Sequence, residues 1–320
     1  MRVVVSGAAG FIGSHLVDRY LADGYYVIGI DNFLTGSPEN LSEARGNDRF
    51  TFVEADVTGD LSETARVLSD GRLDLVLHFA SPASPVDYGN EPIATLRVNS
   101  RGTEAMAELA LRYDAAFLYA STSESYGDPL EHPQRESYWG NVNPVGVRSC
   151  YDESKRYGEA LVSTLVRTED LNGRIVRIFN TYGPRMQLDD GRVVPNFVRQ
   201  ALAGEELTLY GQGTQTRSFC FVDDLVEGIV RCAASPQTRG MVMNLGNPDE
   251  YPIRKFAEIV SDAVGVPLRI KPMPLPPDDP TRRCPDISRA EQMLGWRPAV
   301  SLDEGLRRTI NYFRMALAQR

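Results

Sequence analysis

Short and almost continuous apolar runs alternate with amphipathic stretches through the first half of the chain. The runs read RVVVSG, YYVIGID, FTFVEADV, LDLVLHFAS, AAFLYAST and GRIVRIFN. Runs of this length, rich in Val, Ile, Leu and Phe, are typical of strands that are buried on both faces of a parallel sheet. We therefore predict an α/β fold with a doubly wound parallel sheet of the Rossmann type, in which ligands bind at the carboxyl ends of the strands.

The apolar pattern loosens after about residue 180, where Pro, Gly and Arg become frequent. The segment KPMPLPPDDPTRRCPD (271–286) is predicted to be largely irregular, because proline lacks a backbone N–H and fixes φ. We predict a dinucleotide-binding Rossmann domain over residues 1–180 and a smaller C-terminal substrate-binding lobe over residues 181–320. The two can share a strand or a helix.

The net charge and the cysteine content exclude several classes of function and ligand. A net charge of −9 argues against non-specific binding of nucleic acid, so an anionic ligand has to meet locally placed cations. The first strand begins at residue 2 and no apolar run approaches the length of a membrane span, so we expect neither a signal peptide nor a membrane partner. The four cysteines lack metal-site spacing, which favours no metal and a reducing, cytoplasmic location.

A glycine-rich turn follows the first predicted strand in VVVSGAAGFIGSHL. Gly7, Gly10 and Gly13 are spaced three residues apart, with Phe11 and Ile12 between the last two. Glycine allows a tight turn and a close approach of the backbone to a pyrophosphate, which then lies at the positive end of the following helix. A glycine connection without a ligand is the alternative. The position between a strand and a helix favours dinucleotide binding.

The ends of the next strands carry residues that could contact the rest of a dinucleotide. Asp31 ends the second strand, where a carboxylate can bind an adenosine ribose. Asn32 follows it, and no arginine awaits a 2′-phosphate, so NAD is favoured over NADP. Asp56 is either an adenine contact or a cap of the third strand. Val57 and Ala80 complete the predicted cofactor contacts.

A tyrosine and a lysine lie four positions apart in SCYDESKR. On a helix Tyr151 and Lys155 share a face, although such pairs also arise by chance on helix surfaces. A free tyrosine is a weak base at neutral pH, and a nearby ammonium favours the phenolate. Beside a nicotinamide cofactor, Tyr151 could then remove the proton of a substrate alcohol.

These features, with YASTSESYG and YDESK, resemble the extended short-chain dehydrogenase/reductase family over essentially the whole chain. In that family the tyrosine is the catalytic base, and the lysine also holds the nicotinamide ribose. The segments RIFNTYGPRM, DGRVVPNFVRQAL, YGQGTQTRSFCFVDDLVEG and DDPTRRCPDISRAEQMLGWRP are similar to the UDP-glucuronate decarboxylase (UDP-xylose synthase) branch. Ser154 departs from the glycine usual there, with little expected consequence.

The resemblance implies decarboxylation of UDP-glucuronate to UDP-xylose through a UDP-4-keto intermediate. It places Thr122, Ser123 and Glu124 beside the substrate ring. Ser123 stands at the position where a dehydratase of the family has an aspartate. Glu124 carries a charge that an epimerase does not need. A 4-epimerase or dehydratase acting on another nucleotide sugar remains an alternative. A non-catalytic NAD-binding regulatory protein is the other, and the intact pair of Tyr151 and Lys155 argues against it.

The resemblance also implies a set of contacts to the UDP-sugar. Arginine suits both its pyrophosphate and its carboxylate, although each arginine read alone would be a solvated surface charge. The expected contacts are Asn180, Arg192, Tyr210, Arg217 and Arg283, with Tyr88 and Arg97 as weaker candidates. Family members of this type form homodimers through two helices from each subunit, here near residues 91–113 and 151–168.

Overall fold

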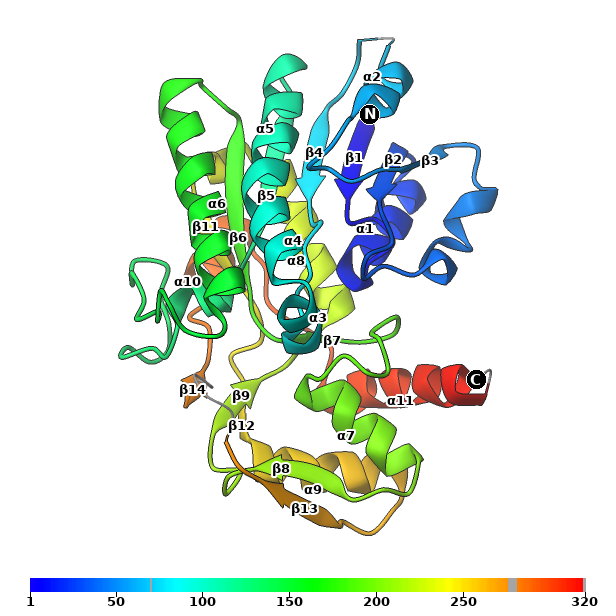
Figure 1. Cartoon of the computed structure of the whole chain (residues 1–320), viewed down its shortest axis with the longest axis vertical. Coiled ribbons are helices and arrows are strands. Elements are labelled where there is room, and N and C mark those ends of the chain that lie inside the picture. The colour runs from blue at the N-terminus through cyan, green and yellow to red at the C-terminus, as the bar shows by residue number, and fades with distance from the viewer. Residues whose placement is uncertain (70, 276–280, 319–320) are drawn as a thin grey trace.

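A seven-stranded parallel sheet forms the upper part of the molecule (Figure 1). The computed structural model describes residues 1–69, 71–275 and 281–318. The six predicted apolar runs form strands β1 to β6, which confirms the Rossmann-type fold, and a seventh strand joins them in the order β11-β6-β5-β4-β1-β2-β3. Their bounds are β1 (Arg2–Ser6), β2 (Tyr26–Asp31), β3 (Phe50–Glu54), β4 (Leu75–His78), β5 (Ala116–Thr122), β6 (Gly173–Ile178) and β11 (Val242–Leu245).

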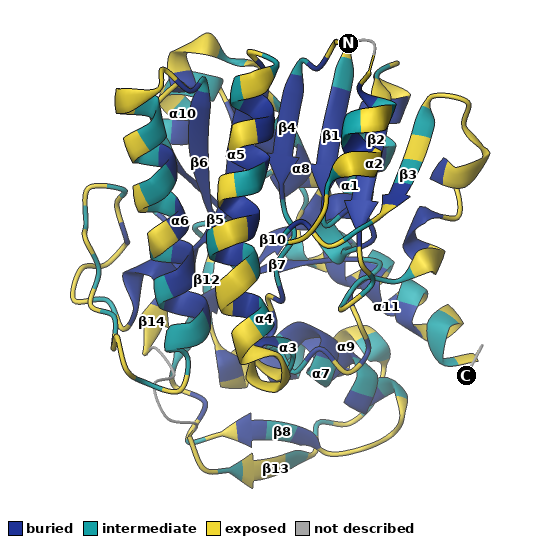
Figure 2. Ribbon diagram, turned by 45° about the horizontal axis from the view of Figure 1, so that its top comes forward, coloured by how far each residue is buried: buried dark blue, intermediate teal, exposed yellow. Residues whose placement is uncertain are grey.

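Helices cover both faces of this sheet, as the near-continuous apolar runs require. They include α1 (Phe11–Ala22), α2 (Ser62–Val67), α3 (Pro85–Asn90), α4 (Pro92–Arg97), α5 (Thr103–Arg112), α6 (Ser149–Thr168), α8 (Val222–Ala234) and α10 (Ser288–Leu294). Successive residues of a strand point to opposite faces. Val3 and Val5 therefore join the apolar cluster under α1 and α8, whereas Val4 joins the cluster under α5 and α6. In Figure 2 the central strands of this sheet are mostly dark blue, the edge strand β3 is partly teal and yellow, and yellow marks the outer sides of α4, α5 and α6.

The lower part is smaller and holds short sheets and three helices (Figure 1). The helices are α7 (Val193–Leu202), α9 (Ile253–Val264) and α11 (Leu302–Ala318). The strands are β7 (Thr181–Tyr182), β8 (Leu207–Tyr210), β9 (Thr216–Ser218), β10 (Cys220–Phe221), β12 (Glu250–Pro252), β13 (Ile270–Met273) and β14 (Arg282–Arg283). Because β11 and α8 also come from beyond residue 180, the chain returns to the upper part after entering the lower one.

The proline-rich segment 271–286 contains two short strands within mostly irregular chain. Strand β13 pairs in parallel with β8 and sets Pro272 opposite Leu209. Proline is tolerated there because β13 has only one partner strand and can leave its other edge without a donor. Strand β14 pairs with β9 and brings Arg283 opposite Arg217. Residues 276–280 lie outside the described part. Across the described residues, no helix has the length and apolarity needed to span a membrane.

Candidate active site

The glycine turn packs so closely that side chains are excluded from it. Gly7 has a φ of 74° and donates its N–H to the Ile30 carbonyl at 2.8 Å, and Gly10 precedes the first residue of α1. A Cβ added to Gly13 would lie 1.9 Å from the Gly7 carbonyl oxygen, and one added to Gly7 would lie 2.7 Å from backbone atoms of Phe79 and Ala80. The N-terminus of α1 is therefore left bare for a ligand.

A cavity of about 150 Å³ lies beside the turn, and we call it the turn cavity. Among its lining residues are Gly7, Gly10, Asp31, Asn32, Asp56, Val57, Ala80 and Arg97. The structure thus brings most of the predicted cofactor residues together, while Phe11, Ile12 and Gly13 form the first turn of α1. Arg97, expected as a weaker substrate contact, instead lies here with an exposed side chain.

Two carboxylates shape the turn cavity. Asp31 accepts backbone hydrogen bonds from Ala9 at 2.9 Å and Phe33 at 2.8 Å, yet burial outweighs them and raises the pKa of Asp31. Asp56 accepts from the Thr58 hydroxyl at 2.7 Å and from the Asn32 amide at 3.2 Å. Asp56 therefore caps the turn after β3 and also lines the cavity, so both interpretations of this residue fit the structure.

Tyr151 and Lys155 lie on the first turns of α6, and both side chains are buried. The Lys155 ammonium Nζ donates to the Ala120 carbonyl at 2.9 Å and lies 5.8 Å from the centre of the Tyr151 ring. On its other side Tyr151 stacks against Tyr88, with ring centres 4.9 Å apart and planes at 10°. The tyrosine ring thus contacts Tyr88 of the sequence-distant helix α3 as well as Lys155 of its own helix.

Burial dominates the acid–base properties of this pair. It raises the pKa of Tyr151 to about 12, although a hydrogen bond with the Thr122 side chain acts in the opposite direction. Burial also lowers the pKa of Lys155 to about 7, so its positive charge is weakened. In the protein alone, desolvation therefore disfavours the charged forms of both Tyr151 and Lys155.

Glu124 is held between two arginines. It lies in the short helix η4 (Ser123–Tyr126) after β5, next to the buried Ser123. Its Oε2 accepts from Arg148 Nη2 at 2.6 Å, and its Oε1 forms an ion pair with Arg283, whose side chain is 2% exposed. Arg283 also donates to the Gly127 carbonyl at 2.8 Å. Burial opposes ionisation, but Arg283 and Arg148 outweigh it and lower the pKa of Glu124.

Asp152, the residue after the tyrosine, has the opposite environment. It is 7% exposed, and within the described part of the chain its Oδ1 has no hydrogen-bond partner. Burial and the negative charge of Glu124 raise the pKa of Asp152 to about 7, against the effect of Arg148 and Arg283. Neither Arg148 nor Asp152 is among the site residues predicted from the sequence. The signal available was the pair of charges flanking the tyrosine in RSCYDE.

These charged residues border a second cavity, of about 230 Å³, which we call the charged cavity. It is lined by Glu124, Gly127, Asp128, Asn141, Val142, Asn143, Arg148 and Asp152. Its lining comes from three parts of the chain: the turn after β5, the long loop that follows it, and the start of α6. Cations and carboxylates therefore face a common space beside Tyr151.

Three further predicted substrate residues, Arg217, Arg192 and Asn180, line neither of these two cavities. Arg217 is buried and lies opposite Arg283 through the β9–β14 pairing. Arg192 precedes α7 and forms an ion pair with Asp190, with Nη2 and Oδ2 2.6 Å apart. Asn180 follows β6, and its carbonyl accepts from the Cys220 N–H at 2.9 Å.

Two other residues named in the sequence analysis, Tyr210 and Ser154, have different surroundings. Tyr210 ends β8 in the outer two-stranded sheet, and it lines neither the turn cavity nor the charged cavity. Ser154 accepts a hydrogen bond from the Asn99 amide at 3.0 Å and donates to the Tyr151 carbonyl at 2.9 Å. The serine hydroxyl therefore joins α6 to the π-helical segment η3 (Val98–Gly102).

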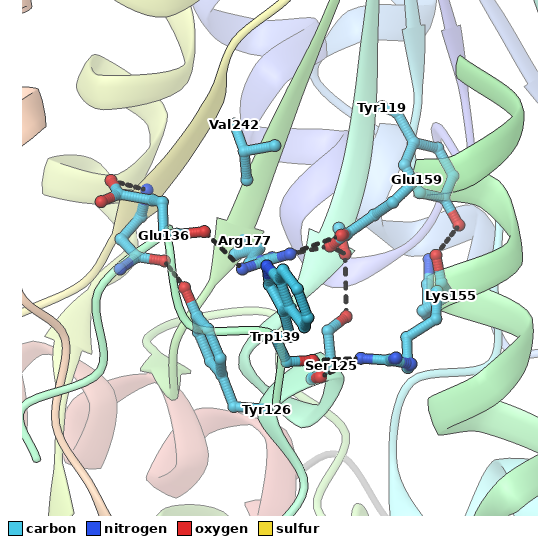
Figure 3. Close-up of polar contacts among 12 residues, drawn as sticks. Tyr119, Ser125, Tyr126, Glu136, Trp139, Lys155, Glu159, Arg177 and Val242 are labelled. Carbon is cyan, nitrogen blue, oxygen red and sulfur yellow. Dashed lines mark hydrogen bonds and ion pairs between the residues drawn. The ribbon is translucent and has the colours of Figure 1, made fainter. Parts of the chain in front are cut away.

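A polar network fixes α6 against the sheet behind the site (Figure 3). One turn beyond Lys155, Glu159 forms an ion pair with Arg177 of β6 at 2.6 Å. The Arg177 guanidinium lies over the Tyr126 ring, 4.6 Å from its centre, and the Tyr126 hydroxyl donates to Asn244 of β11 at 2.8 Å. The network spans two strands and the turn that carries Glu124, so the register of α6 relative to that turn is set by buried contacts.

Comparisons with known proteins agree with this geometry. Residues 3–246 match the NAD dependent epimerase/dehydratase family. UDP-glucuronic acid decarboxylase 6 of Arabidopsis thaliana is 50% identical over 318 residues, which cover 99% of this chain and 90% of the relative. UDP-glucuronic acid decarboxylase 1 of Xenopus tropicalis is 47% identical over 316 residues, which cover 99% of this chain and 73% of the relative.

Solved structures with the same fold include enzymes of more than one activity. UDP-glucuronic acid 4-epimerase from Bacillus cereus, in complex with UDP-glucuronic acid and NAD, superposes with a TM-score of 0.89 at 29% identity and covers 99% of this chain and 100% of its own. A dTDP-glucose 4,6-dehydratase from Streptomyces venezuelae with NAD bound gives a TM-score of 0.90 at 29% identity, with coverage of 100% and 98%. The fold alone therefore does not select the reaction.

Proposed function

The chain belongs to the NAD dependent epimerase/dehydratase family, and we propose that it is an NAD-dependent UDP-glucuronate decarboxylase that forms UDP-xylose through a UDP-4-keto intermediate. The observation that carries this proposal is the identity of 46–50% to curated UDP-glucuronic acid decarboxylases across nearly the whole chain. The solved 4-epimerase and dehydratase share only 29%. The arginine-bound Glu124 beside Tyr151 is the geometry that supports it.

The shape and the charge of the turn cavity fit NAD. Backbone contacts at Gly7 and Gly13 leave no room for side chains. Asp31 at the end of β2 would meet a 2′-phosphate with like charge. Asp31 and the neighbouring Asn32 would thus hold the adenosine end. The chemistry that the bound dinucleotide supplies is reversible acceptance of a hydride from C4 of the sugar.

The proton of the C4 hydroxyl would be taken up and returned by Tyr151, with Thr122 and Lys155 beside it. Tyr151 is buried beside Thr122, so a proton taken by the phenol is shielded from water until it is returned. Lys155 supplies the positive charge that favours the phenolate, although burial lowers the pKa of Lys155 to about 7. A ligand that excludes water or adds positive charge nearby therefore changes how readily Tyr151 acts as a base.

The charged cavity would receive the uronate end of the sugar. Once C4 is a ketone, the C6 carboxylate belongs to a β-keto acid and can leave as carbon dioxide. A third carboxylate entering beside Glu124 and Asp152 is tolerable only because Arg148 and Arg283 lie there, and these arginines can hold it in position. Ser123 lies next to Glu124 and supports the same turn.

Incubation of the protein with NAD and UDP-glucuronate tests the proposal. We expect release of carbon dioxide and formation of UDP-xylose, with no net consumption of NAD. The nucleotide sugar is identified by NMR. A 4-epimerase would give a C4 epimer of the uronate without carbon dioxide, and a dehydratase would act on a neutral hexose. A non-catalytic regulatory protein would bind NAD and leave every nucleotide sugar unchanged.

We infer that the enzyme forms a homodimer through α4 and α6. These helices pack against each other, and their outer sides carry Ile93, Leu96 and Tyr157, which are 56%, 40% and 49% exposed. Apolar side chains on two adjacent helices favour a helical interface between copies. Light scattering at micromolar concentration tests this inference, and a monomeric mass would contradict it.

A reducing compartment such as the cytoplasm is the location we propose. All four cysteines are free thiols, and three of them are buried. Buried thiols suit a protein that does not depend on disulfides for stability. Fractionation of cells that produce the protein would test the location.

A further inference from the structure

Asp152 is a buried carboxyl group to which the mechanism above gives no task. It follows Tyr151 on the first turn of α6 and lines the charged cavity together with Glu124 and Arg148. Within the described residues its Oδ1 is buried without a hydrogen-bond partner. An unsatisfied buried oxygen costs free energy, so a protein that keeps one at the edge of a cavity has a use for it.

Of the three carboxyl groups that line the charged cavity, Glu124 and Asp152 differ in how they are held. Arg148 and Arg283 bind both oxygens of Glu124, whereas the Oδ1 of Asp152 is bound by neither. The charges that face Asp152 come from three elements: Glu124 on η4, Arg148 at the start of α6 and Arg283 on β14, with Glu153 next to it on its own helix.

These surroundings separate the two groups by pKa. Burial and Glu124 raise the pKa of Asp152, while the arginines lower that of Glu124. Two carboxyl groups whose environments separate them in this way are suited to different acid and base tasks. Of the two, Asp152 is the one that can carry a proton at neutral pH.

We propose that Asp152 is the acid that protonates C5 of the sugar after carbon dioxide has left. This inference rests on the proposed decarboxylase function. It assigns Asp152 a step that every decarboxylation of this kind needs, because the carboxylate leaves as neutral carbon dioxide and one proton is taken up in each turnover.

The step balances as follows. The C5–C6 bond breaks, and its electron pair remains on the sugar as the enolate of C4 and C5. The O–H proton of Asp152 passes to C5, the enolate becomes the 4-ketone, and Asp152 is left as a carboxylate. It regains a proton from solvent through the charged cavity, whose volume of about 230 Å³ is large enough for water.

The neighbouring groups are less suited to this step. The proton of Tyr151 is the one removed from the C4 hydroxyl, and it has to return to that oxygen when the ketone is reduced. Glu124 is held as a carboxylate by Arg148 and Arg283.

Asp128 also lines the cavity, but it is exposed and its Oδ1 accepts hydrogen bonds from the backbone N–H and the hydroxyl of Thr281 at 3.1 Å. Asp152 is therefore the buried acid of the cavity that follows Tyr151 and whose Oδ1 is bound by neither arginine.

The substitution Asp152→Asn tests the inference in deuterated water. In the wild-type protein we expect one deuterium at a single C5 position of UDP-xylose. In the variant, turnover should fall by about 10²–10⁴-fold, as for loss of a general acid. The reduced dinucleotide should accumulate, because the enolate has to be protonated before the ketone can be reduced. Deuterium should enter both C5 positions, because water then protonates the enolate from either side.

The matched control is Glu153→Gln. It removes one negative charge from the next position of the same helix, where Glu153 pairs with Arg156 at 3.5 Å and lines neither cavity. We expect this control to keep wild-type turnover and a single C5 label. Calorimetric binding of NAD and UDP establishes that each variant is folded.

The results separate the two proposals. Wild-type turnover with a single C5 label in Asp152→Asn overturns the role of Asp152 while leaving the decarboxylase function intact. A wild-type protein that releases no carbon dioxide from UDP-glucuronate overturns the function itself. If Asp152→Asn does not fold, the pH profile of the wild-type protein decides: turnover has to fall as pH rises above neutrality, and a rate that stays level to pH 9 contradicts the inference.

Discussion

The turn cavity and the charged cavity differ in the groups that shape them, which are backbone atoms in the first and charged side chains in the second. The first has a glycine turn at its centre, where a Cβ on Gly7 or Gly13 would collide with backbone atoms and one on Gly10 would lie 3.2 Å from the Gly7 carbonyl oxygen. The second is lined by the charged side chains of Glu124, Asp128, Arg148 and Asp152, and Arg283 of β14 forms an ion pair with Glu124. The difference indicates a division of tasks, in which backbone shape selects the cofactor and opposed charges select the substrate and its reaction.

The substitution with the largest expected effect removes the phenol hydroxyl of Tyr151, the residue before Asp152 of the charged cavity. Tyr151→Phe should lower turnover by about 10²–10⁴-fold, because the general base is lost while the ring can still stack on Tyr88. Binding of NAD and of UDP should remain near wild type in calorimetry. Near-normal turnover would show that Tyr151 has only a packing role.

Arg283→Ala should damage the charged cavity and spare the turn cavity. Arg283 is fully buried against Glu124, and loss of one partner of a buried ion pair costs about 3–5 kcal/mol. We expect a loss of stability of that order in urea denaturation and a fall in kcat/KM for UDP-glucuronate of one to two decades or more. The affinity for NAD should change less than twofold.

The exposed neighbour Arg282 provides the control for this substitution. It lies on the same short strand, and Arg282→Ala removes the same charge from the surface. It should behave as wild type in both measurements. Equal effects of the two substitutions would mean that total charge, and not the buried pair, governs the site.

Gly13→Ala should have the converse effect on the two cavities. The added methyl group would lie 1.9 Å from the Gly7 carbonyl, so the turn has to move. Overpacking of this kind costs about 1–3 kcal/mol, which corresponds to one to two decades of affinity for NAD. UDP binding should stay within twofold. Gly46→Ala is the control, since a Cβ there meets no atom within 4 Å.

The same contrast explains which features could be predicted from the sequence. The turn cavity depends on three glycines within seven residues and on a strand-end aspartate, so local spacing reveals it. Arg148 and Asp152 gain their importance only when Glu124 and Arg283, distant in sequence, arrive beside them. Proximity of Lys155 to Tyr151 was predictable from helix geometry, but the burial that moves both pKa values was not.

The smallest predicted effect concerns stability as a function of pH, and it has opposite signs for two of the carboxyl groups of the charged cavity. The folded protein lowers the pKa of Glu124, so the stability from Glu124 is present above the ordinary pKa of a glutamate and is lost as pH falls. The folded protein raises the pKa of Asp152. Its stability is therefore complete below the ordinary pKa of an aspartate and is lost as pH rises through about 7.

Asp152→Asn removes the cost of ionising Asp152 and should therefore gain stability relative to wild type between pH 5 and pH 8. One pKa unit corresponds to about 1.4 kcal/mol, so the relative gain should be about 1–3 kcal/mol in urea denaturation at the two pH values. Glu124→Gln should lose stability by a constant amount from pH 8 to pH 5, and the loss should become smaller only as pH falls below the ordinary pKa of a glutamate. Parallel curves for the two variants would show that Arg148 and Arg283 act on both carboxyl groups alike, and the electrostatic distinction within the charged cavity would be wrong.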